Sequence, residues 1–180
     1  AAPTGAAPTS AAPTSGPTGQ GSNVARASGV TVTASSEEAG TGQTAAKAVD
    51  GVASGYPTDY TREWATVGGR GGSWINLAWD KPVTLNRVVL FDRPNDADQV
   101  TGGSLTFSDG TTVPFGSLDN SGTATGVTFA PRTTSSLRVT VNTVSGTTEN
   151  VGLAELEAWG TVAPAPATNV ARTAGATIMG

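Results

Sequence analysis

Residues 74–79 read Trp-Ile-Asn-Leu-Ala-Trp, and this stretch indicates the fold class. Large apolar side chains alternate with smaller or polar ones, so Ile75, Leu77 and Trp79 fall on one side of an extended chain. This pattern predicts a β-strand that has one face in a core and the other face toward solvent.

Other strand-length runs lie on both sides of this stretch. The run 84–91 follows a predicted turn at 80–82 and ends in four apolar residues, so we expect it at the centre of a packed sheet. The remaining runs are 30–34, 104–107, 112–115, 127–129, 137–141 and 153–159. Asp109-Gly110 favours a hairpin between two of them. Because no segment keeps a helical period, the sequence predicts an all-β fold, an antiparallel β-sandwich of the jelly-roll type.

The 180 residues divide into three parts by composition. Residues 1–22 repeat Pro and Thr without a charge or a large apolar side chain, so we expect a disordered linker. Residues 23–160 have the size of one compact domain. Residues 161–180 contain a Pro/Ala tract and then Asn-Val-Ala-Arg at 169–172, which repeats residues 23–26. We expect this last part to be a linker followed by the truncated start of a second repeat.

Composition argues against several classes of function. The chain has no cysteine and no histidine, which removes thiol nucleophiles, the usual general base and the commonest transition-metal ligand. Its net charge of −4 argues against nucleic acid as a partner. No apolar run approaches the roughly 20 residues that span a bilayer, so membrane insertion is not expected. Pro-Thr linkers are typical of secreted proteins, so we expect an extracellular monomer with further domains in the parent chain.

The loop that begins at Asp50-Gly51 is long for a compact domain and is rich in oxygen atoms and aromatic rings. It follows a short apolar segment, 45–49, that could form one helical turn. Asp-Gly is a turn dipeptide, and the turn points a carboxylate and several carbonyls inward. That is the ligand set of a hard cation such as calcium, although an ordinary turn without an ion fits the same residues.

Six short motifs stand in order along the chain. They are Asn23-Val24-Ala25-Arg26, Val32-Thr33-Ala34-Ser35-Ser36, Ala45-Ala46-Lys47-Ala48-Val49-Asp50-Gly51, Glu63-Trp64-Ala65-Thr66, Trp74-Ile75-Asn76-Leu77 and Gly152-Leu153-Ala154-Glu155-Leu156-Glu157. Together they resemble the discoidin, or coagulation factor C-type, domain, a galactose-binding-like sandwich that includes family 32 carbohydrate-binding modules. The segments 89–95 and 98–103 further resemble a bacterial subgroup attached to polysaccharide-acting enzymes. The resemblance covers residues 23–160 and implies a non-catalytic module that binds carbohydrate.

The resemblance also implies a structural calcium ion where the Asp-Gly loop meets the last strand. By position, the ligands are the carboxylates of Asp50 and Glu155, the carbonyls of Lys47, Val52 and Ala154, and a hydroxyl of Thr58 or Thr61. Many relatives have Thr two residues before the Trp, where this chain has Arg62, so the hydroxyl ligand must come from elsewhere in the loop. Two carboxylates with neutral oxygens suit calcium, which takes about six to eight oxygen ligands.

Most relatives bind sugars on loops at one edge of the sandwich. Sugars need an aromatic ring against their C–H face and planar polar groups for adjacent hydroxyls. The candidates are Tyr56, Tyr60, Arg62, Trp64, Arg93, Asn95 and Asp96. Tyr56 and Tyr60 are favoured because aromatic residues in a polar loop have no obvious packing role. Trp64 is expected in the core, since the family's matching Trp packs inside, and Arg93 could instead pair with Asp92 or Asp96.

Two other functions stay open from the sequence. A glycosidase needs two carboxylates, and Glu37-Glu38 or Glu155 with Glu157 could supply them. The first two are adjacent and would diverge, and Glu155 is assigned to calcium, so we expect no enzyme activity. The alternative is an adhesion domain for a cell-surface protein or phospholipid. Such relatives usually present apolar and basic side chains, whereas these loops carry Tyr, Asp and Asn.

Overall fold

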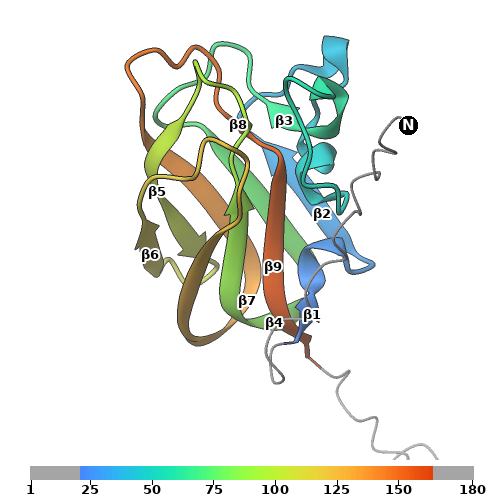
Figure 1. Ribbon diagram of the computed structural model, residues 1–180. Helices are drawn as coiled ribbons and strands as arrows, with labels where there is room; N and C mark the ends of the chain where they lie inside the picture. Colours follow the sequence, from blue (N-terminus) through green and yellow to red (C-terminus); the bar gives the residue numbers. More distant parts are fainter. Residues whose placement is uncertain (1–20, 164–180) are drawn as a thin grey trace, which may run out of the picture.

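The computed structural model describes residues 21–163, which form a β-sandwich, so the all-β prediction is confirmed (Figure 1). The strands are β1 (Ser22–Asn23), β2 (Val30–Ala34), β3 (Trp64–Ala65), β4 (Trp74–Phe91), β5 (Val100–Phe107), β6 (Thr112–Phe115), β7 (Thr125–Val144), β8 (Gly152–Leu153) and β9 (Glu155–Val162). Four short 3₁₀ helices complete the described part: η1 (Val24–Arg26), η2 (Ala39–Thr41), η3 (Ala45–Val49) and η4 (Tyr60–Arg62).

The long strands β4 and β7 form the frame of the sandwich. They pair antiparallel from Trp74 with Thr140 to Leu90 with Thr125, and the register shifts twice on the way. The first half of β4 pairs with β2 and the second half with β9, so one strand serves both layers. The two halves of this strand meet in a bend, and the two ends of β4 therefore lie at the same end of the molecule (Figure 1).

The chain turns at 80–82 as predicted, but no strand ends there, and the predicted division of β7 into two strands is wrong. The chain bends at a register shift between Ala78 and Val83 and stays in one strand. A shift of this kind re-aims a strand without ending it. Pro82 lies inside the irregular part, where its missing N–H removes no ladder hydrogen bond.

The buried residues of β4 follow the alternation that the sequence predicts, with one switch from odd-numbered to even-numbered positions. Ile75, Leu77 and Leu85 are fully buried and odd-numbered, whereas Val88 and Leu90 are fully buried and even-numbered. The second register shift lies between residues 85 and 87. One extra residue in a strand sends the following side chains to the opposite face, so the bulge keeps the apolar residues in the core.

The first ordered segment is tied to both layers. The side-chain oxygen of Asn23 accepts hydrogen bonds from the backbone N–H groups of Ala25 and Ala158, each at 3.1 Å. The indole of Trp79 donates to the carbonyl of Val24 at 2.8 Å. Ser22 pairs with Gly160, so the ordered domain begins before residue 23.

The domain boundaries differ slightly from the predicted 23–160. Strand pairing extends to Ser22 at one end and to Val162 at the other, so these residues belong to the sandwich and not to the linkers. The predictions for residues 1–20 and 164–180, including the repeat at 169–172, lie outside the described residues.

Loops gather at the end of the sandwich opposite the bend of β4 (Figure 1). We call them the crown, and they comprise residues 35–63, 66–73, 92–99, 116–124 and 145–151. Backbone hydrogen bonds connect some of them directly: Thr66 N–H donates to the carbonyl of Val151, and Val151 N–H donates to the carbonyl of Gly69. The crown is where sequence and resemblance place the candidate site.

Candidate functional site

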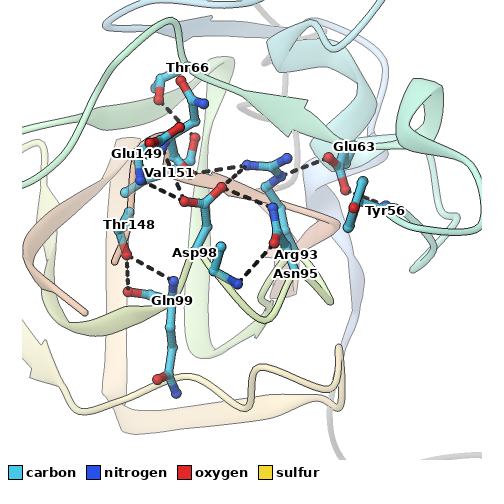
Figure 2. Close-up of polar contacts among 12 residues, drawn as sticks. Tyr56, Glu63, Thr66, Arg93, Asn95, Asp98, Gln99, Thr148, Glu149 and Val151 are labelled. Carbon is cyan, nitrogen blue, oxygen red and sulfur yellow. Dashed lines mark hydrogen bonds and ion pairs between the residues drawn. The ribbon is translucent and has the colours of Figure 1, made fainter. Parts of the chain in front are cut away.

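A buried ionic network centred on Arg93 joins the loops of the crown (Figure 2). Arg93 follows the end of β4 and is 6% exposed. Its Nε donates to Glu63 Oε1 at 2.7 Å, and its Nη1 donates to Asp98 Oδ2 at 3.3 Å and to the carbonyl of Asn150 at 3.0 Å. Glu63 and Asp98 are also buried, so each charge has its partner inside the protein.

The carboxylate of Glu63 holds the loop that carries Tyr56. Its Oε1 accepts a second hydrogen bond from Gln43 Nε2 at 2.7 Å, and its Oε2 accepts one from the backbone N–H of Tyr56 at 2.8 Å. A Cβ atom at Gly55 would overlap Glu63 Oε2, so this close approach requires glycine. Glu63 thus fixes the backbone of the long loop against the Arg93 network.

Asp98 holds the other side of the network. Its Oδ1 accepts from the backbone N–H groups of Glu149 at 2.7 Å and Asn150 at 3.3 Å, and its Oδ2 accepts from Asn95 Nδ2 at 3.0 Å. These contacts tie the 92–99 loop to the 145–151 loop. Buried polar groups that are fully paired make a rigid arrangement, and here that arrangement is the floor of the crown.

Asp92 closes the base of the 92–99 loop. Its Oδ1 accepts from the backbone N–H of Arg93 and its Oδ2 from the backbone N–H of Val100, each at 3.0 Å. Burial raises the pKa of Asp92 to about 7, although both hydrogen bonds and the nearby Arg93 charge act in the opposite direction.

Two of the seven sugar-binding candidates are buried. Trp64 is 1% exposed and donates from its indole to the carbonyl of Ser36 at 2.9 Å, so it has no ring face for a sugar. Arg93 was predicted to pair with Asp92 or Asp96 if it did not bind sugar, and that pairing is wrong: its side-chain partners are Glu63 and Asp98. A pattern of near neighbours in sequence cannot reveal a partner that lies 30 residues away.

One nitrogen of Arg93 has no partner within the described residues. Nη2 makes none of the hydrogen bonds that hold Nε and Nη1. It belongs to a side chain that is fixed by two carboxylates and is 6% exposed.

The other sugar-binding candidates lie at or near the surface. Tyr56 is 44% exposed and Tyr60 is 49% exposed, so both rings are available to a ligand. Asp96 is exposed, and its side chain makes no hydrogen bond within the described part of the chain. Asn95 is half-buried, and both ends of its amide are occupied, by Asp98 and by the backbone N–H of Ala97.

The Asp-Gly turn lies against the last strand. Gly51 has φ 86°, and its backbone N–H donates to Glu155 Oε1 at 3.1 Å. Glu155 is 1% exposed, and its Oε2 has no hydrogen-bond partner in the described residues. Burial, with a smaller contribution from the charge of Asp50, raises the pKa of Glu155 to about 8. A buried carboxylate oxygen without a partner beside a second carboxylate fits a bound cation.

The remaining metal candidates differ in how they fit. Thr61 Oγ1 donates to Asp59 Oδ1 at 2.6 Å, while Thr58 is exposed. Arg62, which replaces the family Thr, places Nη1 3.8 Å from Asp50 Oδ2 and Nε 3.7 Å from Asp59 Oδ2. Within residues 21–163 there is no group of three or more His, Cys, Asp or Glu that could hold a metal, so an ion here would depend on two carboxylates with carbonyl and hydroxyl oxygens.

Sequence reasoning missed Glu63, Asp98 and Asn150 as parts of the site. Glu63 was noted only within the Glu-Trp-Ala-Thr motif. A glutamate next to a tryptophan that is expected in the core indicates a buried ion pair, because a glutamate side chain is rarely buried unless its charge has a partner.

A family model described as "Domain of unknown function (DUF7402)" matches residues 23–159. The chain belongs to this family. The matched range covers almost the whole ordered sandwich of this DUF7402 domain, including both carboxylates at the Asp-Gly turn and the Arg93 network. No curated protein matches the chain in sequence.

Solved structures similar to this DUF7402 domain include three sugar-binding modules. The family 32 carbohydrate-binding module of C. perfringens NanJ, in complex with galactose, has a TM-score of 0.58 and 18% identity, over 73% of this chain and 94% of that one. CpGH89CBM32-5 from Clostridium perfringens, in complex with GalNAc-β-1,3-galactose, has a TM-score of 0.57 and 18% identity, over 72% and 94%. A mutant of chitosan-binding module 1 from a chitosanase/glucanase of Paenibacillus sp. IK-5 has a TM-score of 0.56 and 28% identity, over 72% and 93%.

These similarities confirm the galactose-binding-like fold that the sequence motifs predict. None of the helices between residues 21 and 163 has the length and apolar character that a membrane crossing requires.

Proposed function

We propose that this chain is a non-catalytic carbohydrate-binding module of a secreted, multi-domain, polysaccharide-acting protein, and that it binds glycan through its crown. The observation that carries the proposal is the exposed ring of Tyr56 on a loop whose backbone is bonded to the buried Glu63–Arg93 pair. Similarity to carbohydrate-binding modules of the same fold supports it.

The crown offers the two kinds of contact that a sugar needs. The rings of Tyr56 and Tyr60 are apolar faces for stacking, and Arg93 Nη2 is a donor for a hydroxyl oxygen. Arg93 loses little freedom on binding because two carboxylates already hold it. A pre-organised donor reduces the entropic cost of recognition.

The proposal includes a structural calcium ion at the Asp-Gly turn. Asp50 and Glu155 would supply carboxylates, carbonyls near Lys47, Val52 and Ala154 would supply neutral oxygens, and Thr58 or Thr61 would complete the set. The fit rests on the unpartnered Oε2 of buried Glu155 beside the turn. When bound, the ion would supply positive charge that stabilises both carboxylates, and so would fix the base of the loop that carries the two tyrosines.

Adhesion to a phospholipid surface or a cell-surface protein is a second candidate, which one observation favours. Val67, in the crown, is 61% exposed, and Arg70 lies close to it in the same loop. An apolar tip beside a basic residue is a feature of membrane-binding loops. Against this, Asp59, Asp96 and Glu149 place negative charge on the crown, which disfavours anionic lipid.

A glycan array probed with the full 180-residue chain tests the first proposal. We expect binding to a defined set of glycans. Tyr56→Ala should weaken it about two- to ten-fold, because an aromatic stacking contact contributes about 0.5–1.5 kcal/mol. Val67→Ala is the matched control and should leave glycan binding unchanged. Adhesion would be supported instead if the chain binds no glycan on the array, binds phosphatidylserine vesicles, and loses the vesicle binding in the Val67→Ala variant.

A further inference from the structure

The carboxylates of Asp50 and Glu155 each use one oxygen to hold the Asp-Gly turn. Asp50 Oδ1 accepts from the backbone N–H of Val52 at 2.9 Å, and Glu155 Oε1 accepts from that of Gly51 at 3.1 Å. Glu155 Oε2 is buried and has no hydrogen-bond partner within the described residues. Burial is the main cause of the raised pKa of Glu155, and the nearby charge of Asp50 adds to it. The oxygens left for a divalent cation are therefore Asp50 Oδ2 and Glu155 Oε2.

Arg62 faces the oxygen that Asp50 does not use on the turn. Its Nη1 is 3.8 Å from Asp50 Oδ2, and the side chains of Arg62 and Asp50 are 47% and 23% exposed. At this distance the guanidinium attracts the carboxylate and repels any cation that binds the same oxygen. Arg62 and a metal ion are thus alternative counter-charges for Asp50.

Arg26 adds a second positive charge to the turn. A Cβ atom at Gly51 would overlap the guanidinium of Arg26, so this group lies directly against the turn. Its charge acts to lower the pKa of Glu155, against the effect of burial. Two carboxylates and two guanidinium groups have no net formal charge, and a divalent cation would raise the total to +2. This excess of positive charge predicts weak binding of the ion.

Arg62 can leave Asp50 without losing an ionic partner. Its Nε is 3.7 Å from Asp59 Oδ2. Hydrogen bonds from the hydroxyl and the backbone N–H of Thr61 lower the pKa of Asp59, so this carboxylate stays ionised at neutral pH. Because exposed side chains change rotamer within nanoseconds, Arg62 can turn from one carboxylate to the other.

We infer that Arg62 is an internal competitor of calcium: its guanidinium competes with the ion for Asp50 Oδ2 and keeps the calcium affinity of the turn low. This inference rests on the calcium ion of the proposed function and adds the residue that sets its affinity. Calcium sites of extracellular modules have dissociation constants on the order of 10⁻⁴–10⁻³ M, and we expect this site in that range. Its occupancy would then follow the surrounding calcium concentration.

Calcium titrations of the full chain test the competition. We would titrate calcium chloride into chelator-treated protein by calorimetry, at neutral pH and an ionic strength of about 0.1 M. Arg62→Gln removes the charge and keeps a polar side chain, and it should tighten calcium binding about two- to thirty-fold. An exposed pair of unit charges is worth up to about five-fold, and a divalent ion doubles that free energy. The melting temperature of the variant should rise at correspondingly lower calcium concentrations.

Three controls assign the gain to the charge of Arg62. Arg62→Lys keeps the charge and should keep most of the low affinity. Lys81→Gln makes the same change in net charge at an exposed position in the bend of β4, at the opposite end of the molecule, and should leave the affinity unchanged. Glu155→Gln in the Arg62→Gln background should abolish calcium binding, because it removes the charge of the buried carboxylate. At about 1 M ionic strength the Debye length falls from roughly 10 Å to roughly 3 Å, and the gain should shrink.

The outcomes separate this inference from the proposed calcium ion. Equal calcium affinities of the native and Arg62→Gln chains, or a gain as large in Lys81→Gln or Arg62→Lys, overturn the inference and leave the ion in place. Calcium binding that survives Glu155→Gln places the ion elsewhere and overturns both. So does the absence of heat and of a melting shift in both the native and Arg62→Gln chains at about 10 mM calcium, ten times the upper end of the expected range. Calcium binding by the Arg62→Gln chain alone supports the inference.

Discussion

Removing one charge from the buried Arg93–Glu63 pair should destabilise the domain more than any surface change. Arg93→Met deletes hydrogen bonds of 2.7, 3.3 and 3.0 Å to Glu63, Asp98 and the carbonyl of Asn150. It leaves two carboxylates that are at most 6% exposed without their cation. Breaking a buried ion pair in this way costs about 3–5 kcal/mol. For a domain of this size we expect the melting temperature to fall by roughly 10–15 °C.

A double-mutant cycle separates the pair from the rest of the network. Glu63→Gln keeps the shape of the side chain and removes its charge, and it should cost about 3–5 kcal/mol by itself. If the two side chains interact, the loss of unfolding free energy in the double variant should be about 1–3 kcal/mol smaller than the sum of the losses in the two single variants. Urea unfolding followed by fluorescence reports this, because Trp64 lies in the core beside Glu63.

A matched surface change calibrates the measurement. Arg62→Met removes a guanidinium that is about half exposed and 3.8 Å from Asp50, so it should cost about 0–1 kcal/mol. An Arg93→Met variant no less stable than Arg62→Met would refute the reasoning. So would strictly additive effects in the cycle, because the network would then not hold the crown together.

Four further measurements address the rest of the site. Chelation of calcium should lower the melting temperature of the chain, and Glu155→Gln should remove that dependence; an unchanged midpoint argues against a structural ion. Burial raises the pKa of Asp92 to about 7 from its ordinary value of 3.8, so the stability tied to its protonated form is fully present below 3.8 and is lost as the pH rises through about 7. Asp92→Asn should therefore flatten the curve of stability against pH between 3.8 and about 7. An identical slope in the variant would mean that Asp92 does not cause this pH dependence. Gly55→Ala should cost about 1–3 kcal/mol because its Cβ overlaps Glu63, and a variant of normal stability would show that the loop moves freely. Tyr60→Ala should weaken glycan binding with no change in melting temperature, whereas a loss of both would mean that the ring packs in the fold.

The pattern of side chains within each strand was sufficient to predict the fold class, because the alternation of apolar and polar residues shows which face of the strand is buried. The alternation through Ile75, Leu77 and Trp79 predicts a half-buried strand, and all three are buried. The hairpin with Asp109-Gly110 forms as predicted, with Gly110 at φ 81°. In both cases the signal lies in residues close in sequence, the alternation in the strand and the turn dipeptide in the hairpin.

The continuity of β4 could not be predicted in the same way. Asp80-Lys81-Pro82 has the composition of a turn, and a sequence pattern alone does not distinguish a turn from a bulged bend inside one strand. Pairing with β2 and β7 on one side of the bend and with β7 and β9 on the other decides the outcome. Those partners are distant in sequence.

The sequence alone determined the sandwich, the exposed tyrosines and, through motif resemblance, the closeness of Asp50 to Glu155. Only the tertiary structure decided that Arg93 is buried between Glu63 and Asp98 instead of pairing with its neighbours in the chain. The physical reason is the cost of taking a charge out of water. A buried guanidinium needs carboxylates in its own desolvated surroundings, and which ones are there depends on how distant loops pack together.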